Sequence, residues 1–114
     1  MSESIQEGHL VVFVTAASTE EAAALAKTLV KERLAACGNV VSGIRSIYHW
    51  QGRIEDQPEA LVILKTRAEL FEALKKRVLE LHSYEVPEVI AMPVAAGHKV
   101  YLDWIDSSTQ NEQH

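Results

Sequence analysis

The chain has 114 residues, of which 47% are hydrophobic and 24% charged, as expected for one globular domain. Its formal net charge is -5 without a basic cluster, which argues against nucleic-acid binding, because phosphate contacts need a positive face. The single cysteine, Cys37, excludes an intrachain disulfide, and no apolar run approaches the ~20 residues of a membrane span. Since the first residues also lack a signal-peptide pattern, we expect a cytoplasmic protein with one domain over 1–114 and an ordered core at about 9–106.

The chain is predicted to begin its fold with a strand and a helix. His9–Ala16 is a continuous apolar run, which is typical of a central strand that is buried on both faces. Ser18 and Glu21 have the spacing of a capping box, and apolar residues then recur at helical spacing as far as Leu34. Gly38 is placed to end this helix.

The longest predicted feature is a β-hairpin over 39–66, with its turn at Gln51-Gly52. If the first strand begins near residue 39, it spans about 40 Å, whereas a compact chain of this length has a diameter of about 34 Å. The hairpin tip must therefore project from the domain. It carries Tyr48 and Trp50, large apolar groups that a lone monomer seldom exposes, so we expect other copies of the chain to cover it.

The second half of the chain repeats the alternation of strand and helix. Pro58 lies in the second hairpin strand and should mark a bulge or a place where pairing changes, because proline has no N–H for the ladder. Thr66 and Glu69 form a second capping box ahead of an amphipathic helical pattern. A short strand is expected in 88–94, and 99–105 is a C-terminal appendage.

This order of elements predicts an α+β fold of the ferredoxin-like type, βαββαβ, with a long hairpin arm. Right-handed crossovers place both helices on one face of an antiparallel sheet and leave the other face bare. A bare apolar sheet needs a partner sheet, which this chain cannot supply. We therefore expect a closed homo-oligomer.

Four segments, ERLAACGNVVSGIRSIYHWQGRIED, ALVILKTR, LHSYEVPEVIAMPV and YLDWI, resemble the CutA family of divalent-cation tolerance proteins, in the same order and over nearly the whole chain. The resemblance implies a ferredoxin-like subunit in a homotrimer that is similar to the PII proteins. Tyr48, Trp50 and Trp104 are the expected trimer contacts. The resemblance also implies a link to metal tolerance, with copper binding in some members of the family.

The family's copper-binding residues are only partly present. The family pattern has a thiol near the end of the first strand, where this chain has Val14, and two adjacent histidines, of which Leu81 replaces one and His82 remains. His82 is either a ligand for Cu(II) or another divalent metal, or a helix-terminal histidine at the negative end of the dipole. Cys37 is either a soft-metal ligand or a small buried hydrophobe. No cofactor is required on this reading.

A second candidate site is an inter-subunit cleft like that of the PII assembly. Its candidate residues are Glu59, Lys65, Tyr84, Glu85 and Glu88. The alternative is a structural Lys–Glu pair across the interface. Because the chain has no phosphate loop or catalytic motif, we expect a non-enzymatic metal-response trimer that interacts with itself and with a metal ion or small ligand. A PII-like small-molecule-binding or signalling trimer and a purely structural trimer are the alternatives.

Overall fold

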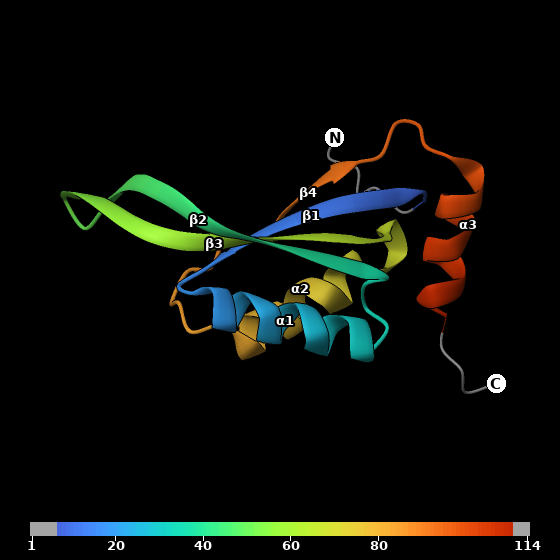
Figure 1. Ribbon diagram of the computed structural model, residues 1–114, viewed down its shortest axis with the longest axis horizontal. Helices are drawn as coiled ribbons and strands as arrows, with labels where there is room; N and C mark the ends of the chain where they lie inside the picture. The colour runs from blue at the N-terminus through green and yellow to red at the C-terminus, as the bar shows by residue number, and fades with distance from the viewer. Residues whose placement is uncertain (1–6, 111–114) are drawn as a thin grey trace.

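The computed structural model describes residues 7–110, and every structural statement below concerns this part of the chain. Four strands form one antiparallel sheet in the order β2-β3-β1-β4 (Figure 1), which confirms the predicted α+β class. The elements are β1 His9–Ala16, α1 Thr19–Lys31, β2 Cys37–Trp50, β3 Arg53–Arg67, a 3-10 turn Ala68–Leu70, α2 Phe71–Leu81, β4 Ile90–Pro93 and α3 Lys99–Ser108.

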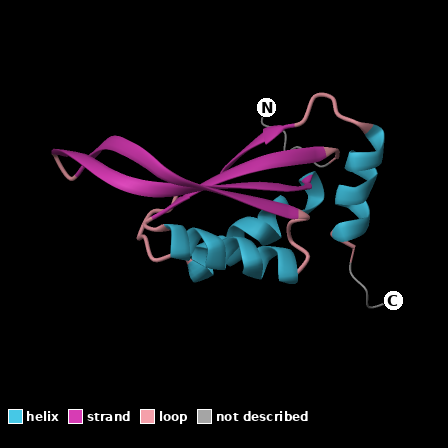
Figure 2. Cartoon of the chain, in the orientation of Figure 1, coloured by secondary structure: helices cyan, strands magenta, loops and turns pink. Residues whose placement is uncertain are grey.

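Helices α1 and α2 lie side by side on one face of the sheet, and the opposite face is open (Figure 2). Every second residue of β1, and of β3 between Ala60 and Thr66, is buried under these helices. Among them are Val12, Val14 and Leu64, which are at most 1% exposed. The residues between them, such as Phe13 and Ile63, are only partly buried. β1 is therefore central in the sheet, but the expectation that it is buried on both faces is wrong for the single chain.

β2 and β3 continue beyond the body as a hairpin arm (Figure 1). Gln51 and Gly52 have φ values of 52° and 80°, as a type I′ turn requires. The molecule measures 47 × 36 × 26 Å, and its radius of gyration of 14.9 Å exceeds the ~13 Å of a compact chain of this length. The arm exposes apolar side chains, and Ile47 and Ile54 are each 63% accessible. The prediction of a projecting apolar arm is confirmed.

The bulge lies on the opposite strand between Val41 and Ile44, and Pro58 instead marks a place where the pairing of β3 changes, the second alternative that the sequence predicts. Gly43 sits in the bulge with a φ of 76°, a conformation that glycine adopts without strain. Pro58 lies past Ala60, the last β3 residue that pairs with β1. One side of β3 has no ladder partner there, so the missing N–H of proline is tolerated.

Helix α1 begins as predicted but ends earlier. Ser18 Oγ accepts a hydrogen bond from the Glu21 N–H at 3.0 Å, the capping contact that the sequence indicates. The chain leaves the helix through Arg33, which has a φ of 62°, and not at Gly38. Gly38 lies instead in β2 beneath α1, where an added Cβ would be 2.9 Å from the Cβ of Ala26. This glycine therefore permits close packing of the helix on the sheet.

The second predicted capping box is also wrong. Thr66 is fully buried, and its Oγ1 donates a hydrogen bond to the Leu34 carbonyl at 2.7 Å. Its hydroxyl therefore serves the core and not the start of α2. No side chain caps the 3-10 turn that precedes this helix.

The C-terminal appendage is helix α3, which packs at the end of the sheet opposite the arm (Figure 1). His9 Nε2 lies 2.9 Å from Asp106 Oδ1, and Arg67 Nε donates to Thr109 Oγ1 at 2.8 Å. Thr109 is buried, so the packed part of the chain extends past the predicted limit near residue 106. Within residues 7–110, no helix is long and apolar enough to cross a membrane.

Candidate functional site

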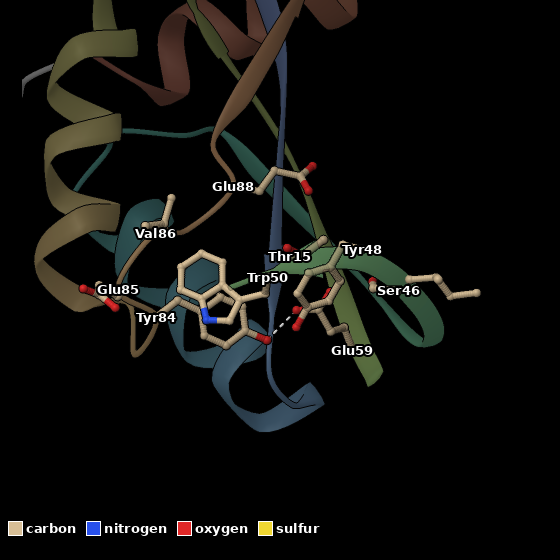
Figure 3. A pocket seen from close by; sticks show the side chains of 10 residues that line it. Thr15, Ser46, Tyr48, Trp50, Glu59, Tyr84, Glu85, Val86 and Glu88 are labelled. Atoms are coloured by element: carbon tan, nitrogen blue, oxygen red, sulfur yellow. Dashed lines mark hydrogen bonds between the residues drawn. The ribbon is translucent and has the colours of Figure 1, made fainter. Parts of the chain in front are cut away.

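A cleft of about 560 Å³ opens between the arm and the loop that follows α2 (Figure 3). Residues from β1, β2, β3 and this loop line it together. They are Thr15, Ser46, Ile47, Tyr48, Trp50, Glu59, Tyr84, Glu85, Val86 and Glu88. All of these lining residues belong to one chain, and the volume of the cleft is in the range of small-molecule sites.

The bulge in β2 determines which arm residues face the cleft. Side chains alternate along a strand, so Ser46, Tyr48 and Trp50 share one face. Ile44 is the direct partner of Glu59, which puts the even-numbered residues of β2 beyond the bulge on the face of that carboxylate. Because the bulge inserts one residue at Gly43, it reverses the alternation along the outer part of β2. Without it, Tyr48 and Trp50 would point to the other side.

His82 fixes the loop that carries Tyr84. The imidazole is fully buried, and Nε2–H donates to the Thr15 carbonyl at 2.7 Å. Nδ1 accepts a hydrogen bond from the Tyr84 N–H at 3.0 Å. The ring is therefore the neutral tautomer, and both of its nitrogens are engaged. A metal ion could bind His82 only if one of these hydrogen bonds broke.

Tyr84 and Glu59 form the polar centre of the cleft. The Tyr84 hydroxyl donates to Glu59 Oε2 (Figure 3), and Glu59 is only 8% exposed. Burial, this hydrogen bond and the negative charge of Glu59 together raise the pKa of Tyr84 well above 10.0. The tyrosine therefore remains a neutral donor, and its proton is directed at the carboxylate.

Four of the five predicted cleft residues line this cleft, namely Glu59, Tyr84, Glu85 and Glu88. Lys65 does not, because it lies about 20 Å of strand away from Glu59 along β3. Its Nζ donates to Asn39 Oδ1 at the far end of β2. A Lys–Glu pair across a subunit interface, the alternative for these residues, stays a prediction. A place for this cleft at a subunit boundary stays a prediction.

The remaining predicted site residues lie outside the cleft. Cys37 is partly exposed, contrary to its interpretation as a buried hydrophobe, and its Sγ is 3.9 Å from Asn39 Oδ1. Burial, and to a lesser extent the nearby Cys37 thiol, raise the pKa of Tyr101. Trp104 lies on α3 with its ring centroid 5.4 Å from that of Tyr101. Between Glu7 and Gln110, no group of three His, Cys, Asp or Glu side chains is placed to hold a metal ion.

The sequence did not indicate every residue of the cleft. Tyr48 and Trp50 were assigned only to subunit contacts, and alternation back to Ser46 would have grouped all three on one strand face. Thr15 and Val86 belong to elements that are far apart in sequence. No local pattern identifies them, because only the fold brings the end of β1 to the loop after α2.

Glu21 anchors the same loop from α1, and its charge should matter for stability. Its carboxylate accepts hydrogen bonds from Ser83 N–H at 2.9 Å, Ser83 Oγ at 3.1 Å and Ala17 N–H at 3.2 Å. Burial by itself would raise the pKa of Glu21, but these hydrogen bonds bring it below 4.5. Because the folded-state pKa is depressed, the stabilisation is present above pH 4.5 and is lost as the pH falls through the folded-state value.

We therefore expect Glu21→Gln to lower the free energy of unfolding by about 1 to 2 kcal/mol at pH 7, and by less at pH 3. Urea unfolding at both pH values measures this difference. Glu20→Gln is the matched control, because Glu20 is in the same helical turn but is exposed. Equal losses for the two variants at pH 7 would show that the Ser83 contacts carry no net stability.

Comparisons with known proteins place this fold and sequence in one family. The family model described as CutA1 divalent ion tolerance protein matches residues 10–108. The divalent-cation tolerance protein CutA of Thermus thermophilus is 50% identical over 99 residues, which are 87% of this chain and 96% of that protein. The chloroplastic protein CutA of Arabidopsis thaliana is 46% identical over 102 residues, which are 90% of this chain and 56% of the plant protein.

Solved structures agree with the sequence matches. The divalent cation tolerance protein (Cut A1) from Thermus thermophilus superposes with a TM-score of 0.87 at 48% identity, over 90% of this chain and 99% of that one. A structure described as the periplasmic divalent cation tolerance protein CutA from Archaeoglobus fulgidus has a TM-score of 0.87 at 41% identity, with coverages of 90% and 99%. The chain described above therefore belongs to the CutA1 divalent ion tolerance family.

Proposed function

We propose that this protein acts in divalent-cation tolerance as a homotrimer that catalyses no reaction. The family match supports the biological role, because the relatives are named as tolerance proteins and not as enzymes. The open face of the sheet is the main observation that supports the proposed homotrimer. We further propose a cytoplasmic location. The PII-like signalling alternative has no support from the comparisons, which name divalent-ion tolerance.

The open face of the sheet is apolar across three strands. Ile90 pairs with Phe13 and Met92 pairs with Val11, so these side chains stand on the face that α1 and α2 leave uncovered. Ile90 and Met92 are 56% and 57% exposed. Ile63 of β3 extends the same surface. A lone chain seldom keeps such a surface in water, whereas three copies could close their open faces around an axis.

The exposed aromatic residues extend this proposed interface. Tyr48 and Trp50 lie on the arm, and Trp104 lies on α3 at the other end of the sheet (Figure 1). Each is about two-fifths exposed in the single chain. An arm that reaches over a neighbouring copy would bury these rings, and aromatic side chains contribute strongly to such contacts.

We propose Cu(II), or another divalent metal, as the ligand of the assembled protein, with Cys37 and His82 as the candidate ligating residues. A single chain does not complete a metal site within its described residues, so the remaining ligands would come from other copies. Cys37 is the more accessible of the two, because it is partly exposed whereas the His82 imidazole is fully buried. His82 must first give up a hydrogen bond.

Calorimetric titration with Cu(II), and with redox-inert Zn(II), tests this metal proposal. We expect Cys37→Ser to weaken binding by at least about tenfold and His82→Ala by less, because loss of one ligand costs more than about 1.4 kcal/mol. His98→Ala is the control, since His98 is an exposed histidine at the start of α3. Millimolar binding that is equal in all four proteins would rule out a specific site at either residue.

Growth of a bacterial strain that lacks its own CutA protein tests the biological role. Expression of this chain should restore growth in copper-supplemented medium, and an equal amount of a monomeric variant should not. Growth that is independent of the chain at every copper concentration would count against a role in metal tolerance.

A further inference from the structure

Glu59 is a buried carboxylate for which the described chain provides no cation. It is 8% exposed, and its Oε2 accepts the hydrogen bond from Tyr84. No lysine, arginine or histidine in residues 7–110 forms an ion pair with it, and its Oε1 is not fully buried, since every buried side-chain oxygen in this range has a hydrogen-bond partner. A carboxylate with so little contact with water is stabilised when an opposite charge reaches it. The open space of the cleft is where such a charge can enter.

The rest of the cleft has the same electrostatic character. Glu85 and Glu88 add two more carboxylates, and none of the lining residues is a lysine, arginine or histidine. Tyr48, Trp50 and Tyr84 supply aromatic rings, whose faces attract cations. Carboxylates together with aromatic rings disfavour anions such as nucleotides and favour a positively charged ligand that also has apolar surface.

We propose that this cleft binds a small organic cation, an ammonium or guanidinium compound, with its charge against the Glu59 carboxylate. Its apolar part would lie against the cleft-facing sides of the Trp50 and Tyr48 rings (Figure 3), so a neighbouring copy in the proposed trimer would cover only their opposite sides. A bare metal ion fits less well, because the carboxylates are not grouped closely enough to ligate one within the described chain. A volume of about 560 Å³ suits a molecule larger than a single side chain. This binding activity is independent of the proposed metal tolerance.

Two matched ligands test the role of charge. Benzylamine is a cation at pH 7, and benzyl alcohol is a neutral molecule of nearly the same size and shape. Titrations of the full-length protein should use phosphate buffer, because Tris is itself a small organic cation. We expect benzylammonium to bind at least about tenfold more tightly than benzyl alcohol, and agmatine, which carries a guanidinium group, to compete with it.

Two matched variants locate the charge that the ligand meets. Glu59→Gln should weaken benzylammonium binding by at least about tenfold and leave benzyl alcohol binding unchanged, because only the charge is lost. Its thermal midpoint without ligand should be equal to or higher than that of the wild type, since an unpaired buried charge is removed. Glu72→Gln changes the net charge equally at a side chain that is 79% exposed, and it should bind as the wild type does.

Three results would each overturn the proposal. Equal affinities for benzylammonium and benzyl alcohol would exclude a role for charge. The absence of binding by both benzylammonium and agmatine would exclude this class of ligand. Unchanged ligand affinity in Glu59→Gln, together with a loss of assembly mass, would mean that a side chain of a second copy supplies the cation. Copper binding by the wild-type protein is measured separately and does not enter any of these three results.

Discussion

Replacement of Ile90 and Met92 by aspartate is expected to convert a trimer of about 38 kDa into a monomer of 12.7 kDa. Both side chains are more than half exposed in the single chain, so the change should cost the isolated subunit little. In a trimer that closes the open sheet faces, the same positions would place charges in an apolar interface. Because of the symmetry, every copy buries these unfavourable charges. We therefore expect the dissociation constant of the trimer to increase by at least about 100-fold.

Sedimentation equilibrium over a dilution series measures the mass directly. The matched control is the double variant Val30→Asp and Leu79→Asp, which adds the same charge on the helical side of the subunit. Val30 and Leu79 are 38% and 51% exposed there. The control should remain trimeric, and circular dichroism should show that both variants are folded. A wild-type monomer at micromolar concentration would contradict the proposed assembly from the outset.

The arm was predictable because its signals are local. A glycine at the turn, β-branched residues on both sides and a length greater than the domain diameter are properties of one continuous segment. The roles of Gly38 and Thr66 could not be predicted, because they depend on residues that are distant in the sequence. Each fits a helix-end rule, but Gly38 is required by the approach of Ala26, and the hydroxyl of Thr66 is taken by the Leu34 carbonyl. Tertiary contacts from distant residues determined both positions.

In the candidate site, too, some features follow from local sequence and others only from tertiary contacts. Tyr84, Glu85 and Glu88 are close in sequence, and in the structure they line one cleft together with Glu59 of β3. Lys65 was grouped with them because it ends an apolar strand, and strand ends at subunit seams often form ligand pockets. The sequence cannot show the bulge at Gly43, which turns the aromatic face of β2 toward the loop after α2. Metal ligation by His82 was a reasonable expectation for its residue type, but the structure reveals the two hydrogen bonds that occupy its nitrogens.

Gly38→Ala should be among the most destabilising single-methyl changes in this chain. The added Cβ would lie 2.9 Å from the Cβ of Ala26 and 3.2 Å from Cδ2 of Leu64. The leucine methyl can rotate away, but the alanine Cβ is fixed to the backbone of α1, so the helix must move off the sheet. Alanine normally stabilises a strand relative to glycine by about 0.5 to 1 kcal/mol. We expect overpacking to reverse that sign and to cost about 1 to 3 kcal/mol of unfolding free energy.

A double-mutant cycle with Ala26→Gly separates this contact from general effects on the strand. Ala26→Gly alone should cost about 1 kcal/mol of helix propensity, and more if the removed methyl leaves a void. In the double variant the new methyl on β2 occupies the space vacated on α1. The combined loss should therefore be smaller than the sum of the single losses by about 0.5 to 3 kcal/mol. Urea unfolding at one fixed protein concentration measures all four proteins, since assembly makes stability depend on concentration. Additive losses would mean that α1 and β2 are not in close contact at Gly38, and the packing of the helical layer on the sheet would then differ from the arrangement described above.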